Sequence, residues 1–150
     1  MYQRILVPVD GSDTSNCGLE EASRLAKEQG AKLKCLHVID EHFLAHDYLG
    51  FAYMPDLFET LRKNGETILE EAGAQAEKAG VSAESVLREG GGSHVSGTIL
   101  DEAKTWGADL IVMGTHGRRG ISHLAIGSDA ELVVRGSTVP VLLVKKRPSR

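Results

Sequence analysis

Two short apolar runs, separated by a glycine-rich loop and a helical pattern, lie between residues 109 and 144, and this order constrains the fold most. Leu110 to Met113 are four consecutive apolar residues, too few for a helix and without polar alternation. Such a run suits a strand that is buried on both faces of a parallel sheet. Val141 to Val144 form a second run, after a helical pattern that starts at Ser128. We therefore predict a strand, a helix and a strand in this stretch.

Three earlier runs predict further strands, over residues 5–9, 32–39 and 81–87. Pro8 lies inside the first run, near the end of the strand, where a ladder hydrogen bond is not required and proline is tolerated. The third run is more polar than the others, as expected for an edge strand.

Helical patterns fill the intervals between these strands. Expected helices begin at capping residues or proline and stop at glycine. Asn64-Gly65 is a weak point in the longest of them. The alternation of strands and helices over residues 1–150 indicates a single α/β domain, an open parallel five-stranded sheet with helices on both faces. The predicted starts are Asp10-Gly11-Ser12-Asp13, Pro55-Asp56 and Gly90-Gly91-Gly92-Ser93, and the predicted stops are Gly30, Gly80 and the region of Trp106.

The loop after Met113 has glycines at 114, 117, 120 and 127 and leads into the helical pattern at Ser128. Glycine lets the main chain approach a ligand closely, and the first turn of a helix presents unpaired N–H groups and the positive end of its dipole. These are the requirements of a phosphate-binding loop. The glycine content alone is explained equally well by a surface loop that only turns the chain and binds no ligand.

The spacing is more specific. Gly114 and Gly117 are followed after nine residues by Gly127-Ser128, which resembles the glycine motif of ATP-binding members of the universal stress protein family. The resemblance covers nearly the whole chain. Its other segments are Ile5-Leu-Val-Pro-Val-Asp10, Leu36-His37-Val38-Ile39-Asp40, Ile111-Val-Met-Gly-Thr-His-Gly117 and Pro140-Val-Leu-Leu-Val144.

This resemblance implies a sheet of order 3-2-1-4-5, as in the adenine-nucleotide alpha-hydrolase-like fold. Ligands of open parallel sheets bind beyond the carboxyl ends of the strands, where the strand order reverses. Here that point lies between the first and fourth strands. Arg118 and Arg119 are suitable counter-charges for phosphate, or solvated loop charges. The nucleotide contacts that the resemblance implies are Pro8, Val9, Asp10, Val38, Met113, Gly114, His116, Gly117, Gly127, Ser128 and Asp129.

Asp129 departs from the family pattern, because many ATP-binding members carry a small apolar residue there. An acid is favourable at the start of an empty helix, but it repels a triphosphate unless a divalent cation intervenes. We therefore expect ATP, or another adenine nucleotide, to bind with the help of Mg²⁺, and Asp129 is the candidate metal contact. The chain has no GxxxxGK[ST], GxSxG or HExxH motif, so no catalytic residue is assigned and ATP hydrolysis is expected to be slow or absent.

Net charge is −4 with acids and bases interspersed, which favours neither nucleic acid nor an anionic membrane as partner. The basic residues at 145–150 are interpreted as a solubilising tail. Cys17 and Cys35 match no metal or redox spacing and are expected to stay reduced. Since the chain has neither a signal-peptide pattern nor an apolar run near the ~20 residues of a membrane span, we expect a cytoplasmic protein.

Residues 43–58 hold five of the seven aromatic residues and form a connection longer than the usual two to six residues. The segment suits a satellite core, a lid over a ligand or a surface for a protein partner. His42 and His46 lie four apart, as metal ligands on one helical face would, but no third ligand is near them in sequence.

The leading hypothesis is a regulatory stress-response protein that binds an adenine nucleotide. It would form a homodimer by pairing the exposed edge of Val141–Val144, as family members commonly do. The alternative is a protein-interaction module of the same fold that works without nucleotide through segment 43–58. An adenylyl-transferring enzyme of similar fold would need further catalytic residues.

Overall fold

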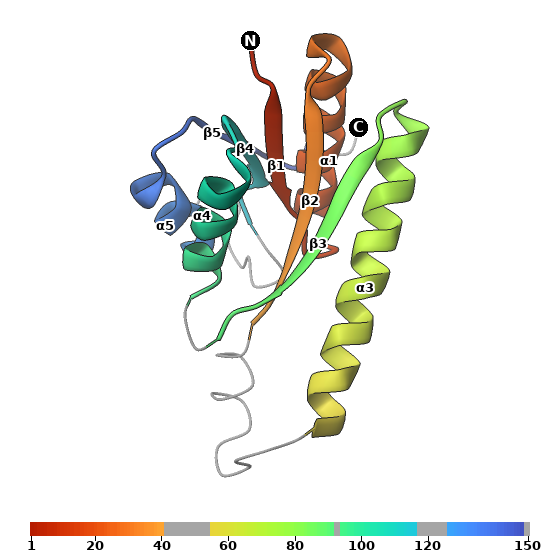
Figure 1. Ribbon diagram of the computed structural model, residues 1–150, viewed down its shortest axis with the longest axis vertical. Coiled ribbons are helices and arrows are strands. Elements are labelled where there is room, and N and C mark those ends of the chain that lie inside the picture. The colour runs from red at the N-terminus through yellow and green to blue at the C-terminus, as the bar shows by residue number, and fades with distance from the viewer. Residues whose placement is uncertain (41–54, 92–93, 117–125, 149–150) are drawn as a thin grey trace.

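The structure, a computed structural model, describes residues 1–40, 55–91, 94–116 and 126–148. Its centre is a parallel sheet of five strands in the order β3-β2-β1-β4-β5 (Figure 1). This confirms the predicted order 3-2-1-4-5, with the more polar strand β3 at one edge and the last strand at the other. The strands are β1 (Arg4–Pro8), β2 (Lys32–Ile39), β3 (Ala83–Glu89), β4 (Leu110–Gly114) and β5 (Val141–Val144).

Strand β1 begins and ends one residue earlier than predicted, and β3 begins and ends two residues later. The shift of β3 follows from the end of the preceding helix. The Val81 amide still donates to the Ala76 carbonyl at 3.0 Å, so this residue closes the helix instead of joining the sheet.

Four described helices connect the strands, and the first is capped as the sequence predicts. The Ser12 hydroxyl accepts a hydrogen bond from the Ser15 amide at 3.2 Å, and Gly30 closes the helix with a φ of +66°. The fourth strand is preceded by a helix whose N-cap is His94. The expected cap Ser93 lies outside the described residues. The helices are α1 (Asp13–Gln29), α3 (Pro55–Lys78), α4 (Val95–Trp106) and α5 (Ser128–Gly136).

Helices cover both faces of the sheet, and each face has its own core (Figure 1). Helices α1 and α3 pack on one face and α4 and α5 on the other. The central strands are buried on both faces because their residues point alternately into the two cores. Buried residues of the first core include Ile5, Val7, Leu19, Cys35, Ile68 and Val112, and those of the second include Leu6, Leu36, Ile99, Ile111, Met113 and Val133.

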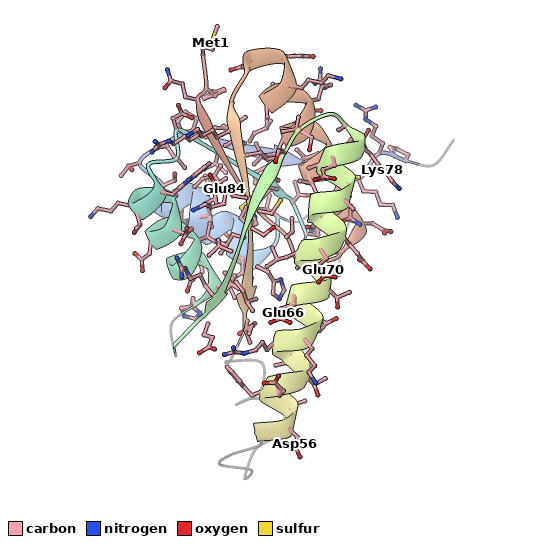
Figure 2. The ribbon with its side chains drawn as sticks, turned by 45° about the vertical axis from the view of Figure 1, so that its right-hand side comes forward. Met1, Asp56, Glu66, Glu70, Lys78 and Glu84 are labelled. Carbon is pink, nitrogen blue, oxygen red and sulfur yellow. The ribbon has the colours of Figure 1, made fainter. Side chains whose placement is uncertain are left out.

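Helix α3 runs without interruption through Asn64-Gly65, the predicted weak point. A Cβ atom on Gly65 would lie 2.7 Å from Cδ2 of His37 and 2.9 Å from a methyl carbon of Leu87. Glycine at 65 therefore lets the helix approach the sheet closely. The outer face of α3 is charged, and Figure 2 shows Asp56, Glu66, Glu70 and Lys78 along its length.

A charged cluster joins α4 to strands β2 and β3. The carboxylate of Glu102 is only 5% exposed and accepts from Lys34 at 3.2 Å and from Arg88 at 3.0 Å. Nζ of Lys34 also lies 4.8 Å from the centroid of the Trp106 ring. Burial alone would raise the pKa of the Glu102 carboxyl, but hydrogen bonds from Arg88 and Lys34, with their charges, hold this pKa below its usual value.

Candidate functional site

The candidate site begins where β1 and β4 part. These strands pair at only two positions, Ile5 with Leu110 and Leu6 with Ile111. The Val9 amide donates to Leu36 of β2 at 2.8 Å, and successive residues of a strand direct their peptide groups to opposite neighbours. The preceding residue, Pro8, therefore faces β4 and has no N–H to donate. Pro8 therefore cannot continue the pairing of β1 with β4 at the place where the strand order reverses.

Helix α1 packs directly against the end of β4. A Cβ atom on Gly114 would lie 2.8 Å from the carbonyl carbon and oxygen of Thr14 and 3.0 Å from the Ser15 amide nitrogen. A Cβ atom on Gly18 would in turn lie 3.3 Å from the Gly114 nitrogen. Because these neighbours are backbone atoms, they cannot move aside as a side chain would. Glycine at 114 thus allows the first turn of α1 and the end of β4 to meet.

Hydrogen bonds hold both ends of the peptide between Val9 and Asp10. Its carbonyl lies 2.7 Å from Nδ1 of His37, and its amide donates to the Ser15 hydroxyl at 3.1 Å. A carboxylate oxygen of Asp10 accepts from the Ser12 amide at 2.9 Å. The Asp10 carboxylate is therefore fixed to the first turn of α1.

Helix α5 begins at the same edge of the sheet. The Gly127 amide donates to the Thr115 carbonyl at 2.6 Å, and the Thr115 amide donates to Val144 at 3.0 Å. Gly127 is the N-cap and has no side chain to accept from the first turn. Ser128 and Asp129 follow and are exposed. An open helix start with no side-chain cap can accept an anion.

The described part of the chain brings ten of the predicted contacts to the carboxyl edge. Val38 is the next-to-last residue of β2, and its side chain packs in the same core as Met113. His116 is half-buried two residues beyond β4. Gly117, Arg118 and Arg119 lie outside the described residues. The ten are Pro8, Val9, Asp10, Val38, Met113, Gly114, His116, Gly127, Ser128 and Asp129.

Sequence reasoning missed the side chains that support this edge. His37 was noted only within a segment of the family resemblance, and Ser15 was not singled out. A buried polar residue in an apolar run, next to a predicted site, was the available signal for His37. The Thr115 hydroxyl is also buried, and the described residues offer it no hydrogen-bond partner.

The basic tail starts at this edge too. Nζ of Lys146 lies 2.7 Å from a carboxylate oxygen of Asp13 in the first turn of α1. The hydrogen bond from Lys146 and its charge lower the pKa of the exposed Asp13 carboxyl. The tail was expected only to solubilise the chain, but Lys146 also contacts the rim of the candidate site.

No group of three or more metal-ligating side chains occurs among the described residues. His42, His46 and most of segment 43–58 lie outside them. Within the described range, both cysteines are free, and burial raises the pKa of the Cys35 thiol to about 11. None of the helices that the structure describes is long and apolar enough to cross a membrane.

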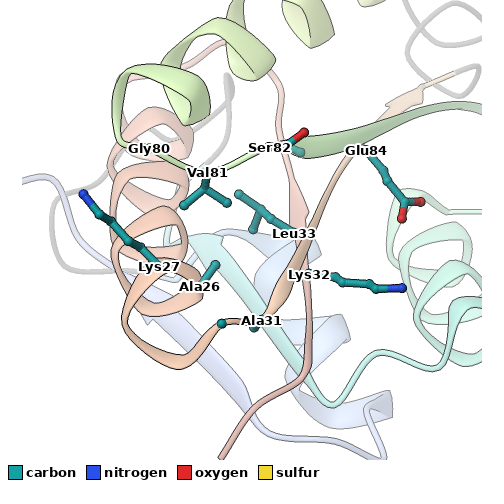
Figure 3. A pocket seen from close by; sticks show the side chains of 11 residues that line it. Ala26, Lys27, Ala31, Lys32, Leu33, Gly80, Val81, Ser82 and Glu84 are labelled. Atoms are coloured by element: carbon teal, nitrogen blue, oxygen red, sulfur yellow. The ribbon is translucent and has the colours of Figure 1, made fainter.

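A separate groove of about 500 Å³ lies at the opposite end of the sheet (Figure 3). It runs between the last turns of α1 and α3 and the first residues of β2 and β3. Lys27, Lys32 and Glu84 flank it, and Leu33 and Val81 supply apolar surface. The groove shares no residue with the carboxyl edge and is not part of the candidate site.

Together, the sheet order and the covering helices define an α/β protein of the open-sheet class, whose members bind ligands at the point where the strand order reverses. Residues 1–145 match the sequence profile of the Universal stress protein family, and the chain belongs to this family. Universal stress protein YxiE of Bacillus subtilis (strain 168) is 39% identical over 97% of this chain and 100% of its own length.

Solved structures agree with this assignment. The structure of MJ0577, a universal stress protein of Methanocaldococcus jannaschii, gives a TM-score of 0.82 at 27% identity and covers 99% of both chains. A universal stress protein solved in complex with cAMP gives a TM-score of 0.69 at 26% identity, over 97% of this chain and 98% of that one.

Proposed function

We propose that this protein is a cytoplasmic regulatory protein that binds an adenine nucleotide, ATP with Mg²⁺, in the crevice between β1 and β4. The observation that carries the proposal is the meeting of three features at one edge: the parted strands, the glycine contact at Gly114 and the open start of α5. The open start of α5 is a feature of phosphate binding by backbone groups. Among the described residues the buried Thr115 hydroxyl has no hydrogen-bond partner, which fits a site that a polar ligand completes.

The comparisons support the same proposal. A family member of similar fold was solved with cAMP, which shares its adenosine and a phosphate with ATP. The glycine motif of this chain, Gly114, Gly117 and Gly127-Ser128, is intact. A protein-interaction module without a ligand would not need that spacing.

The first experiment is to denature the purified protein, identify any released nucleotide by chromatography, and titrate ATP into the emptied protein. Ser128→Pro is the sharpest variant. Ser128 is the first residue of α5, and proline is tolerated there because the N–H that it removes has no partner within the helix. Gly127 has φ −59° and ψ 151°, which suits a residue before proline.

We expect Ser128→Pro to weaken ATP binding about tenfold, the equivalent of one lost hydrogen bond to a charged group, with little change in melting temperature. Ser128→Ala is the matched control, because it removes the hydroxyl and keeps the N–H. Absence of nucleotide and of binding in the unaltered protein would reject the proposal and favour the protein-interaction module.

Mg²⁺ is expected to strengthen ATP binding because Asp129 is in the first turn of α5. Mg²⁺ is commonly held by one or two carboxylates together with substrate phosphates. Calorimetric titration should give a weaker affinity in EDTA than with Mg²⁺, and Asp129→Ala should reduce this difference. Equal affinities of the unaltered protein under both conditions would contradict the role of the metal ion.

A homodimer through β5 is part of the proposal. This strand is at the edge of the sheet, and Leu142 on it is 36% exposed. An apolar strand edge without cover tends to pair with another chain. Light scattering at micromolar concentration should show a dimer that Leu142→Lys weakens. A strict monomer would contradict this part and leave the nucleotide site untouched.

We propose no efficient catalysis. Asp10 and His116 are near the crevice, but the described residues form no nucleophile and base pair there. A turnover of ATP above ~1 s⁻¹, the range of ordinary enzymes, would overturn this expectation.

A further inference from the structure

His37 stands out among the residues of β2 that face α3. On this face Leu33 and Cys35 are apolar core residues, and the next position toward the carboxyl edge is His37, which is only 8% exposed. A polar ring in an apolar core is unfavourable unless it makes a hydrogen bond. The ring makes that bond to the Val9 carbonyl, at 2.7 Å from Nδ1.

The chemistry of this contact fixes the protonation of the ring. A carbonyl oxygen only accepts hydrogen bonds, so Nδ1 of His37 must carry the proton. The other end of the same peptide, the Asp10 amide, donates to the Ser15 hydroxyl at 3.1 Å. Since a peptide group is planar, two hydrogen bonds at opposite ends fix its rotation about the chain.

We propose that His37 and Ser15 are positioning residues that hold the Val9–Asp10 peptide plane and so set the direction in which Asp10 faces a bound nucleotide. The inference rests on the proposed function. Asp10 begins the turn beyond β1, and its carboxylate also accepts from the Ser12 amide. Rotation of the peptide would move the Asp10 backbone and side chain together, because the Asp10 nitrogen belongs to this peptide and is bonded to the Cα atom that carries the carboxylate.

The structure also shows why a rigid peptide is needed here. Strand β1 loses its β4 neighbour after Leu6, since Pro8 has no N–H to donate on that side. Past this point the sheet holds the strand on the β2 side only. His37 and Ser15 act where ladder hydrogen bonds to β4 have stopped. In the absence of hydrogen bonds to β4, the end of β1 is held by the hydrogen bonds of His37 from β2 and Ser15 from α1.

The first test compares nucleotide affinity in variants of the whole chain. His37→Leu removes the donor and keeps an apolar side chain, whereas His37→Asn keeps an N–H close to the place of Nδ1. We expect His37→Leu and Ser15→Ala each to weaken ATP binding about tenfold, the effect of one lost hydrogen bond of about 1.4 kcal/mol. His37→Asn should stay within about twofold of the unaltered protein.

Ser23→Ala is the matched control for Ser15→Ala. Ser23 is buried on the same helix, and its hydroxyl has no partner among the described residues. The control should bind ATP as the unaltered protein does. Urea unfolding of every variant separates a loss of affinity from a loss of folded protein.

The second test reads the ring itself by NMR in the empty protein. Correlation of the two ring nitrogens of His37 with their carbon-bound protons identifies the tautomer, and we expect protonated Nδ1. A ring protonated only at Nε2 would overturn the inference. So would tight ATP binding by folded His37→Leu, or a loss in His37→Asn as large as that in His37→Leu.

This design separates the two proposals. If the unaltered protein binds no nucleotide, the proposed function fails and the role of His37 toward a ligand fails with it. If the unaltered protein binds ATP and the variants bind it equally well, only the positioning role is rejected.

Discussion

The two ends of the sheet are held together by different kinds of contact. At the carboxyl edge, the backbone of Gly114 packs against the Thr14 peptide, and the side chains of Ser15 and His37 hold the Val9–Asp10 peptide at both ends. At the amino end, a carboxylate joins two strands, since Asp109 accepts from the Gln3 and Arg4 amides at 2.8 and 2.9 Å. The Glu102 cluster reaches along the sheet between the two ends, from Lys34 near the start of β2 to Arg88 near the end of β3.

This difference has a consequence for pH. The packing of Gly114 against Thr14 does not depend on pH, because peptide groups do not titrate. The contacts of Asp109 and Glu102 use carboxylates, so their contribution to stability depends on pH and salt.

The largest effect is expected from glycine substitutions at the two ends. Gly114→Ala should lower the free energy of unfolding by about 2–3 kcal/mol, because the new Cβ would overpack against backbone that cannot yield. At the amino end, Gly30→Ala should cost about 1 kcal/mol, since only its φ of +66° opposes the change and no atom lies within 4 Å. Urea unfolding measures both.

ATP titration then sharpens this comparison. Gly114→Ala should bind ATP more weakly than the unaltered protein even at temperatures where both are folded, while Gly30→Ala should bind normally. Equal binding by the two variants would show that the contact between α1 and β4 does not shape the site.

A second effect concerns pH. The pKa of Glu102 is lower in the folded protein than in the unfolded chain, so its contribution to stability is present above the unfolded pKa of about 4.3 and is lost as pH falls through the folded pKa. Glu102→Gln should lower the free energy of unfolding by about 1–2 kcal/mol at pH 7.

The loss caused by Glu102→Gln should shrink as pH falls below about 4.3. Urea unfolding at pH 7 and at acid pH checks this, and ATP affinity at pH 7 should be unchanged. A difference in stability that is constant with pH would show that Lys34 and Arg88 do not stabilise the ionised carboxylate.

The smallest effect compares two glycines on α3. Gly73 is in the carboxyl-terminal half of α3, which lies nearer the amino end of the sheet, and a Cβ atom there meets no atom within 4 Å. Gly73→Ala should stabilise the protein by about 0.5–1 kcal/mol through helix propensity. Gly65→Ala has the same propensity gain, but its Cβ would press on His37, so a net loss of stability is expected.

Thermal unfolding of Gly65→Ala and Gly73→Ala side by side would show these opposite signs. A gain in both would mean that the His37 ring moves aside freely. That result would also weaken the positioning role of His37.

The sheet and its order followed from the sequence because most of the strands are short apolar runs and the family resemblance supplied the order. The bounds of β3 were wrong because local hydrogen bonding decides them at Val81, which closes α3. The close contacts of Gly65 could not be predicted, because its neighbours His37 and Leu87 come from strands. No local pattern shows what a helix will face across a sheet.

The nucleotide contacts stay a prediction, and the structure describes only where their residues lie. Spacing placed Gly114 and Gly127-Ser128 at one edge, since the carboxyl ends of parallel strands meet there. Ser15 and His37 support the Val9–Asp10 peptide through contacts between α1, β1 and β2. Those contacts depend on three-dimensional distances, which the order of residues along the chain does not contain.

The termini lie in unequal surroundings, and this matters for how the protein is handled. Met1 is 99% exposed and precedes β1 at the amino end of the sheet, away from the crevice. The last strand instead delivers Lys146 to Asp13, beside the first turn of α1. An affinity tag or a biosensor surface joined at Met1 is therefore attached at the end of the sheet opposite to the candidate site, whereas Lys146 lies beside that site.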